Sequence, residues 1–177
     1  MAEIKNVVMI GAGLMGHNAA QIFLMAGYNV TLVDIKDEFV DAGAAKIDEG
    51  LKKLEGKGKL GEGVSAASLI GNLKKSIDLA SAVKDADFVL EAVVEKMDVK
   101  KQVFKTCDEN APPHCILATN TSTMSITEIA SATNREDKVI GMHFFNPPIL
   151  MRLIEIIAGE KSSDEAMYIG VELSNSL

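Results

Sequence analysis

Two polar residues near the end of the chain have the types and spacing of an acid–base pair. His143 lies at the end of one apolar run and Glu155 lies in the next, with a double-proline turn at 147–148 between them. If both runs are strands that meet across this turn, the carboxylate would fix the imidazole in one tautomer. The second ring nitrogen would then be free to exchange a proton. A structural histidine with a satisfied partner explains the same residues equally well.

A second candidate site lies at the start of the chain, where the apolar run 4–10 passes directly into the glycine turn GAGLMG. Gly11 permits a tight turn, Gly13 lets a diphosphate approach the main chain, and Gly16 lets the following helix pack close to the strand. Free N–H groups at the helix start would then face the phosphates. The turn therefore predicts a dinucleotide site.

An acidic residue follows at the position that such a site needs. Asp34 comes eighteen residues after Gly16, at the end of the apolar run 29–33. A carboxylate there would accept hydrogen bonds from both ribose hydroxyls of an adenosine and would repel a 2′-phosphate. We therefore expect NAD rather than NADP. A glycine turn in an unrelated α/β protein is the alternative, but strand, turn, helix, second strand and acid occur here in the expected order.

Further polar residues follow two other apolar runs. Glu91 and Glu95 close the run 86–95, and the polar sequence TNTST at 119–123 follows the run 115–118. Ligands of parallel sheets bind at the carboxyl ends of the strands, so either glutamate could meet a ribose or a nicotinamide-side group. Glu91 is the better candidate for an internal role. Serine and threonine before a helix also serve as N-caps, and that explanation of 119–123 stays open.

A sheet is needed to bring these residues to one edge. Apolar runs of strand length alternate along the chain with amphipathic helical patterns, which predicts an α/β, Rossmann-type doubly wound fold with a mostly parallel sheet. We expect strands over 4–10, 29–34, 73–77, 86–95 and 115–118 and on both sides of the double proline, and helices over 38–60, 97–109 and 125–132 and from 163 onward.

The helix expected over 38–60 is longer than a crossover between strands requires. The segment 55–63 after it has four glycines in nine residues, which breaks any continuous helix. We therefore expect a projecting helical arm over about 38–71. Four lysines make its tip the most basic local patch, and either a solvated helix tip or a contact for a ligand phosphate would explain them: Lys52, Lys53, Lys57 and Lys59.

Composition narrows the class of protein. The chain has 177 residues, 47% of them apolar, which fits one domain with the possible start of another. A net charge of −7 argues against nucleic acid or an anionic membrane as the main partner. Cys107 and Cys115 match no disulfide or metal framework, and we expect buried thiols in a reducing cytoplasm and no metal site. No secretory or membrane-spanning pattern is present in the sequence, so we expect a soluble, cytoplasmic protein.

Five stretches together resemble a known family. They are GAGLMG, VTLVD, EAVVE, NTSTMSITEIA and GMHFFNPPILMRLIEII. The chain resembles the NAD-binding domain of the L-3-hydroxyacyl-CoA dehydrogenases over essentially all 177 residues, and its HFFNP segment is far more specific than the glycine motif. The resemblance implies NAD as cofactor, an acyl-CoA substrate and reversible oxidation of a 3-hydroxyacyl-CoA to the 3-ketoacyl-CoA, in fatty-acid β-oxidation or its reverse.

The resemblance also assigns roles to residues. It implies that His143 is the acid/base, that Glu155 orients its imidazole, and that Ser122 lies beside the substrate hydroxyl and the nicotinamide. It places the coenzyme A nucleotide near Lys53, Lys57 and Lys59 on the arm. The implied cofactor contacts are Gly11, Ala12, Gly13, Leu14, Met15, Gly16, Asp34, Glu95, Lys100, Ser122 and Asn146.

Family members continue past the position of Leu177 into an all-helical domain that forms a homodimer and covers the acyl group. We therefore expect residues 1–177 to be the NAD-binding domain of a longer enzyme, with weak or no turnover by itself. One alternative is an isolated NAD-binding or structural module that performs no chemistry. Another is a β-hydroxyacid dehydrogenase acting on free acids, against which the HFFNP segment argues.

Overall fold

The computed structural model describes residues 4–151 and 153–177, and within them one sheet of seven strands runs through the molecule. The strand order is β3-β2-β1-β4-β5-β6-β7, and all neighbours are parallel except β6 and β7. The strands are β1 (Asn6–Ile10), β2 (Asn29–Val33), β3 (Leu73–Ser76), β4 (Phe88–Glu91), β5 (Ile116–Thr119), β6 (Val139–Phe144) and β7 (Ile154–Ala158).

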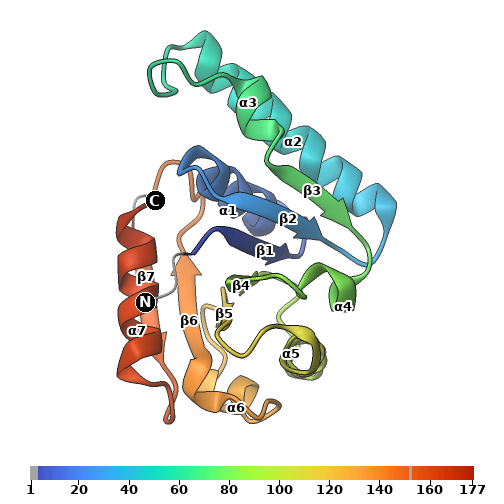
Figure 1. The fold of residues 1–177 in the computed structure, drawn as a ribbon, viewed down its shortest axis with the longest axis vertical. Coiled ribbons are helices and arrows are strands. Elements are labelled where there is room, and N and C mark those ends of the chain that lie inside the picture. Colours follow the sequence, from blue (N-terminus) through green and yellow to red (C-terminus); the bar gives the residue numbers. More distant parts are fainter. Residues whose placement is uncertain (1–3, 152) are drawn as a thin grey trace.

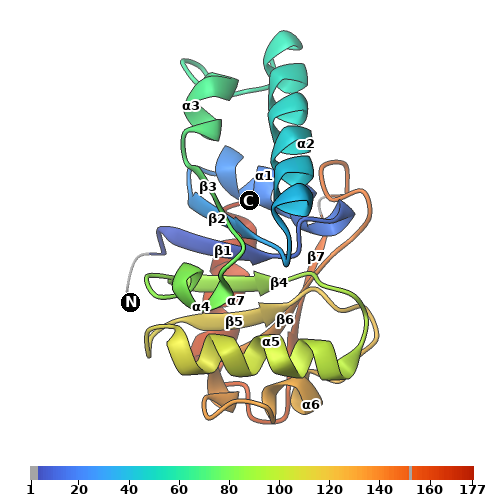
Figure 2. The same cartoon turned by 90° about the vertical axis from the view of Figure 1, so that its right-hand side faces the viewer.

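Helices cover both faces of the sheet (Figures 1 and 2). One face packs on α1 (Leu14–Met25), α2 (Asp37–Gly56) and α7 (Asp164–Asn175), and the other on α4 (Leu79–Ala82), α5 (Met97–Asn110) and α6 (Ile126–Ala130). Successive side chains of β1 point to opposite faces of the sheet. Met9 packs in the core on the α1 side, and Val8 packs in the core on the α5 side. A short 3-10 helix, η1 (Glu136–Lys138), leads into β6. The predicted doubly wound fold is confirmed.

The chain moves outward from β1 to β2 and β3, and then crosses to β4 on the other side of β1. Strand order reverses at this point, and doubly wound sheets bind ligands in the crevice that such a reversal leaves at the carboxyl ends of the strands. The glycine turn follows β1 directly, so it lies at this crevice.

The predicted arm is present. Helix α2 and the short α3 (Ala66–Ile70) pack side by side and rise together away from the sheet, as Figure 2 shows most clearly. Ile47 and Leu51 of α2 are fully buried, whereas the lysines near its end are exposed. The helix ends at Gly56, four residues before the predicted end, because the glycine-rich segment begins there.

Two further boundaries differ from the prediction. Strand β4 ends at Glu91 and not at Glu95, because β1 turns away at Gly11. The last hydrogen bond between the two runs from the Ala92 N–H to the carbonyl of Ile10, at 2.7 Å. Glu95 therefore lies in the loop that follows. Helix α7 begins after Ser163 as predicted but ends at Asn175.

Candidate active site

The glycine turn has the backbone geometry of a dinucleotide site. Gly11 has φ of +98°, a left-handed conformation that favours glycine. A Cβ at Gly16 would lie 1.7 Å from the carbonyl oxygen of Gly11, so helix and turn touch at this point. A Cβ at Gly13 would meet no atom within 4 Å, so the backbone there faces open space. The tight turn at Gly11 and the close packing at Gly16 have the geometry that the sequence predicted, and the open space at Gly13 leaves room for a diphosphate.

The N-terminus of α1 fits a diphosphate. Its first turn has no side-chain cap and no acidic residue, so neither competes for the unpaired N–H groups of that turn. These groups and the positive end of the helix dipole face the open side of Gly13, where they can bind an anion. Leu14 is exposed and Met15 is half-buried in the same turn.

Asp34 is fixed beside the glycine turn. Its Oδ2 accepts a hydrogen bond from the Ala12 N–H at 2.7 Å, and its Oδ1 accepts one from the Ile35 N–H at 2.7 Å. Each carboxylate oxygen can accept a further hydrogen bond, and the side chain is only partly buried. Asp34 is therefore held where ribose hydroxyls could reach it once a diphosphate lies on the turn.

His143 and Glu155 meet as the sequence suggested. They stand directly opposite each other in the antiparallel pair of β6 and β7, and the distance from Nδ1 to Oε2 is 2.8 Å. The His143 side chain is 16% exposed and that of Glu155 is 49% exposed. With Nδ1–H donating to the carboxylate, Nε2 is the nitrogen that can exchange a proton. The ring of Phe145 lies 4.8 Å from the imidazole, centroid to centroid.

The loop after β5 is joined to the strand that carries His143. Asn120 accepts a hydrogen bond at Oδ1 from the Phe144 N–H at 2.8 Å, and its own N–H donates to the carbonyl of Glu91 at 2.8 Å. Ser122, two residues further on, is exposed. The N-cap of α6 is Ser125, which accepts from the Glu128 N–H, so capping does not account for Ser122.

Glu91, Glu95 and Lys100 form one network at the ends of β4 and β5. Lys100 Nζ lies 2.7 Å from Glu91 Oε1 and 3.6 Å from Glu95 Oε2. Glu91 has the internal role that the sequence favoured, because its side chain is fully buried. Lys100, which the resemblance assigned to the cofactor, is also buried, and of the three only Glu95 is open to solvent.

The remaining predicted residues lie on exposed surface. Asn146 follows β6 and is exposed, with a cis peptide bond to Pro147. Lys53 lies in α2, and Lys57 and Lys59 lie in the turn after it, at the far end of the arm. Lys52 instead pairs with Asp48 one helical turn earlier, at 2.7 Å.

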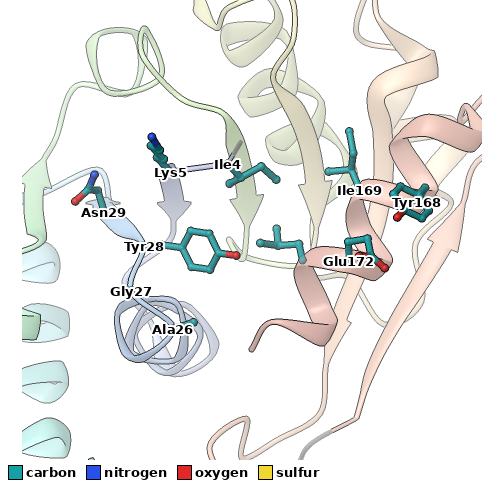
Figure 3. A pocket seen from close by; sticks show the side chains of 10 residues that line it. Ile4, Lys5, Ala26, Gly27, Tyr28, Asn29, Tyr168, Ile169 and Glu172 are labelled. Atoms are coloured by element: carbon teal, nitrogen blue, oxygen red, sulfur yellow. The ribbon is translucent and has the colours of Figure 1, made fainter. Parts of the chain in front are cut away.

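A large groove lies at the opposite edge of the sheet. It has a volume of about 600 Å³ and runs between the turn after α1 and one side of α7. Figure 3 shows Tyr28 on one side of it and Tyr168 and Glu172 on the other. Asn29, which lines it, begins β2, so the groove borders the amino ends of the strands. Because ligands of doubly wound sheets bind at the carboxyl ends, we assign the active site to the His143 edge.

Other reactive side chains do not offer a competing site. Burial raises the pKa of the Cys115 thiol to about 12 and that of Cys107 well above its ordinary range, so neither supplies a thiolate near neutral pH. Within residues 4–151 and 153–177 no cluster of side chains has the make-up of a metal site. Sequence reasoning included Asn120 in the polar run 119–123 but did not single it out, although its place directly after a predicted strand was a usable signal.

Comparison with known proteins identifies the family. The model of the family described as "3-hydroxyacyl-CoA dehydrogenase, NAD binding domain" matches residues 6–177. A probable 3-hydroxybutyryl-CoA dehydrogenase of Bacillus subtilis is 44% identical over 163 residues, which are 92% of this chain and 56% of that protein. The human mitochondrial hydroxyacyl-coenzyme A dehydrogenase is 38% identical, over 98% of this chain and 57% of that protein.

A solved structure agrees with these sequence matches. The crystal structure of (S)-3-hydroxybutyryl-CoA dehydrogenase from Ralstonia eutropha superposes with a TM-score of 0.92 at 39% identity, over 98% of this chain and 61% of that one. The chain thus spans less than two thirds of the relatives it matches. No helix in the described part of the chain is long and apolar enough to cross a membrane. The chain belongs to the 3-hydroxyacyl-CoA dehydrogenase family as its NAD-binding domain, which confirms the predicted family and cofactor.

Proposed function

We propose that the protein containing this chain oxidises an L-3-hydroxyacyl-CoA to the 3-ketoacyl-CoA with NAD, or catalyses the reverse reaction. The observation that carries the proposal is the His143–Glu155 pair, at 2.8 Å, on the same sheet edge as the glycine turn. The names of the relatives support the substrate class, since two are 3-hydroxybutyryl-CoA dehydrogenases and one a hydroxyacyl-coenzyme A dehydrogenase.

The chain's own residues would hold the cofactor at both ends. The backbone of residues 11–16 would bind the diphosphate, and Asp34 would bind the adenosine ribose. Glu95, Ser122 and Asn146 would contact the nicotinamide half. When bound, NAD supplies the acceptor for a hydride.

His143 would act as the base. The hydride leaves C3 of the substrate while the proton of the 3-hydroxyl passes to His143 Nε2, and the product is the 3-ketone. The carboxylate of Glu155 stabilises the imidazolium that forms. The Ser122 hydroxyl would hydrogen-bond the reacting oxygen and hold it near Nε2. In the reductive direction His143 returns the proton to the ketone oxygen.

The basic end of the arm would bind the coenzyme A nucleotide. Lys53, Lys57 and Lys59 are exposed there and carry charge suited to phosphate groups. The net charge of the chain is −7, so an anionic substrate needs such a local basic patch. The pairing of Lys52 with Asp48 makes Lys52 less available for this purpose.

We also infer a further helical domain that covers the acyl group and forms a homodimer, since the relatives are considerably longer than this chain. Light scattering on the longer protein would test the dimer. A cytoplasmic location is consistent with two buried free cysteines, although several relatives are named as mitochondrial. Cell fractionation would separate these two compartments.

A titration with NADH and NADPH, followed by addition of acetoacetyl-CoA, tests the proposal. We expect NADH to bind more tightly than NADPH because Asp34 repels a 2′-phosphate. Turnover that is lost in the His143→Ala variant would support the proposed dehydrogenase activity. Weak turnover by residues 1–177 alone would support the inference of a further domain. NADH binding without turnover, even in the longer protein, would favour the module that performs no chemistry. Binding of neither nucleotide would refute the proposal.

A further inference from the structure

The imidazole of His143 is less exposed than the carboxylate that it contacts. The His143 side chain is 16% exposed, whereas that of Glu155 is 49% exposed. Water competes for a half-exposed carboxylate, and an exposed ion pair favours its own geometry by a factor of about five or less. The hydrogen bond to Glu155 is therefore a weak restraint by itself. A base that must present one ring nitrogen to a substrate needs a further restraint.

The ring of Phe145 makes a second contact with the imidazole. The two ring centroids are 4.8 Å apart, and the ring planes are tilted by 49°. Aromatic pairs at this separation attract each other more than the area they bury would explain. Phe145 is half-buried, so its ring packs on the protein and still reaches the surface beside the candidate site.

The backbone between the two rings is anchored. Successive side chains along β6 point to opposite sides of the sheet, so His143 and Phe145 share one side and Phe144 takes the other. Phe144 is fully buried in the core on the α1 side, and its N–H donates to Asn120 Oδ1 at 2.8 Å. Because Phe144 is held by its side chain and its backbone, the ring of Phe145 is kept against His143.

We propose that Phe145 is a positioning residue for the base. Its ring limits rotation of the His143 imidazole, so that Nδ1–H stays on Glu155 and Nε2 stays directed toward the substrate. Phe145 supplies no group to the reaction and acts only through His143. The inference rests on the proposed function, in which His143 is the base.

The first test measures the tautomer of His143 in the chain itself. Long-range proton–nitrogen NMR spectra with ¹⁵N-labelled histidine report which ring nitrogen carries the proton, and a His143→Ala variant identifies the signals of His143 among the three histidines. At about pH 9, where a histidine side chain is ordinarily neutral, we expect the Nδ1–H form to dominate. In Phe145→Leu the ratio of the Nδ1–H to the Nε2–H form should fall about three- to tenfold, because a rotating imidazole leaves the carboxylate.

The second test measures turnover by the longer enzyme. We expect Phe145→Leu to lower kcat about three- to tenfold, while KM for acetoacetyl-CoA and the affinity for NADH stay within about twofold. A loss confined to kcat indicates an effect on the reacting groups and not on binding. Phe145→Tyr keeps the ring and should retain the kcat of the unchanged enzyme, since a hydroxyl at this half-buried position can reach water.

Two further variants complete the design. Tyr168→Leu is the matched control, because Tyr168 is also a partly exposed aromatic residue, at 49%, but lines the groove at the amino ends of the strands. It should change neither the tautomer ratio nor kcat. Phe145→Met also removes the ring, and it serves as the test if circular dichroism shows that Phe145→Leu does not fold.

The possible failures are distinguishable. An unchanged tautomer ratio in the variant without the ring would refute the positioning role, and so would an unchanged kcat. A higher KM or a weaker NADH affinity with unchanged kcat would make Phe145 a binding contact, which also refutes the proposal. If the unchanged longer enzyme turned over no substrate, the proposed function would fail, and the tautomer ratios would still decide whether Phe145 holds the imidazole.

Discussion

The side chain of Asn120 and the backbone of Phe144 join the two halves of the candidate catalytic site. Asn120 Oδ1 accepts the Phe144 N–H at 2.8 Å, and Phe144 directly follows His143. The loop that carries Ser122 is thereby tied to the strand that carries His143, the proposed base. The bond links residues 24 positions apart, so it forms only once β5 and β6 are paired.

We expect Asn120→Ala to separate these two parts. It leaves the Phe144 N–H without its acceptor, which should lower the free energy of unfolding by about 1–3 kcal/mol in urea titrations. Turnover by the longer enzyme should fall further than NADH affinity, because the cofactor turn is not touched. Asn29→Ala is the control, since Asn29 makes an exposed bond to Asn6. Equal losses in the two variants would argue against a special role for Asn120.

Removing the imidazole of His143 should abolish most turnover without weakening cofactor binding. His143→Ala should lower kcat of the longer enzyme about 10²- to 10⁴-fold, which is the range for a general base, and Glu155→Gln should have a smaller effect. NADH affinity should stay close to that of the unchanged protein in both variants. His114→Ala is the control, because His114 pairs with Asp87 at 3.0 Å, away from the candidate site, and its side chain is 49% exposed. A fully active His143→Ala variant would remove His143 from the mechanism.

Two glycine substitutions should separate folding from cofactor binding. In Gly16→Ala the new Cβ would lie 1.7 Å from the Gly11 carbonyl oxygen, so α1 must shift and both stability and NADH binding should be lost. In Gly13→Ala the Cβ enters open space and φ is −68°, which alanine adopts readily. Stability should therefore change by about 1 kcal/mol or less, while the methyl group hinders the diphosphate. Calorimetry and NADH titration of both variants check this, and tight binding by Gly13→Ala would contradict it.

The Asp108–Arg135 pair should make stability fall in acid. Arg135 Nε donates to Asp108 Oδ1 at 2.8 Å, and Asn134 donates twice to Oδ2. Partial burial alone would raise the pKa of Asp108, but these hydrogen bonds outweigh it and hold the pKa below its ordinary value of 3.8. A depressed folded-state pKa adds stability above the unfolded-state pKa, and this stability is lost as the pH falls through the folded-state pKa.

Asp108→Asn should therefore cost about 1–3 kcal/mol of unfolding free energy near neutral pH. The difference from the unchanged chain should narrow below about pH 4, where the carboxylate takes up a proton in the unfolded state while the native carboxylate, with its lower pKa, is still ionised. Urea unfolding at a series of pH values measures this. Asp41→Asn, which removes an exposed pair with Lys75, is the control and should have little effect at any pH. A difference that stayed constant across the series would contradict the assignment.

The sequence by itself determined the fold class and the cofactor, and it predicted the residues of the cofactor half of the site. Backbone requirements are local, so the glycine turn and the acid Asp34 after the second strand could be recognised from residue types and spacing. The apolar periodicity predicted most elements to within a few residues, and it missed the end of β4 and the short helix α4. The HFFNP segment was the most specific sign of the family. The two apolar runs beside it suggested that His143 and Glu155 meet.

Only the tertiary structure decided which side chains are buried and which strand ends touch. The sequence favoured an internal place for Glu91, but nothing in it marked Lys100 as buried, and the burial of Lys100 depends on how α5 packs over β4 and β5. The bond from Asn120 to Phe144 likewise depends on the pairing of two strands far apart in the chain. The sequence left open which serine or threonine caps α6, and the structure shows that Ser125 does, by accepting a hydrogen bond from the Glu128 N–H. The packing around Lys100 and the bond of Asn120 are long-range, so local residue patterns do not encode them.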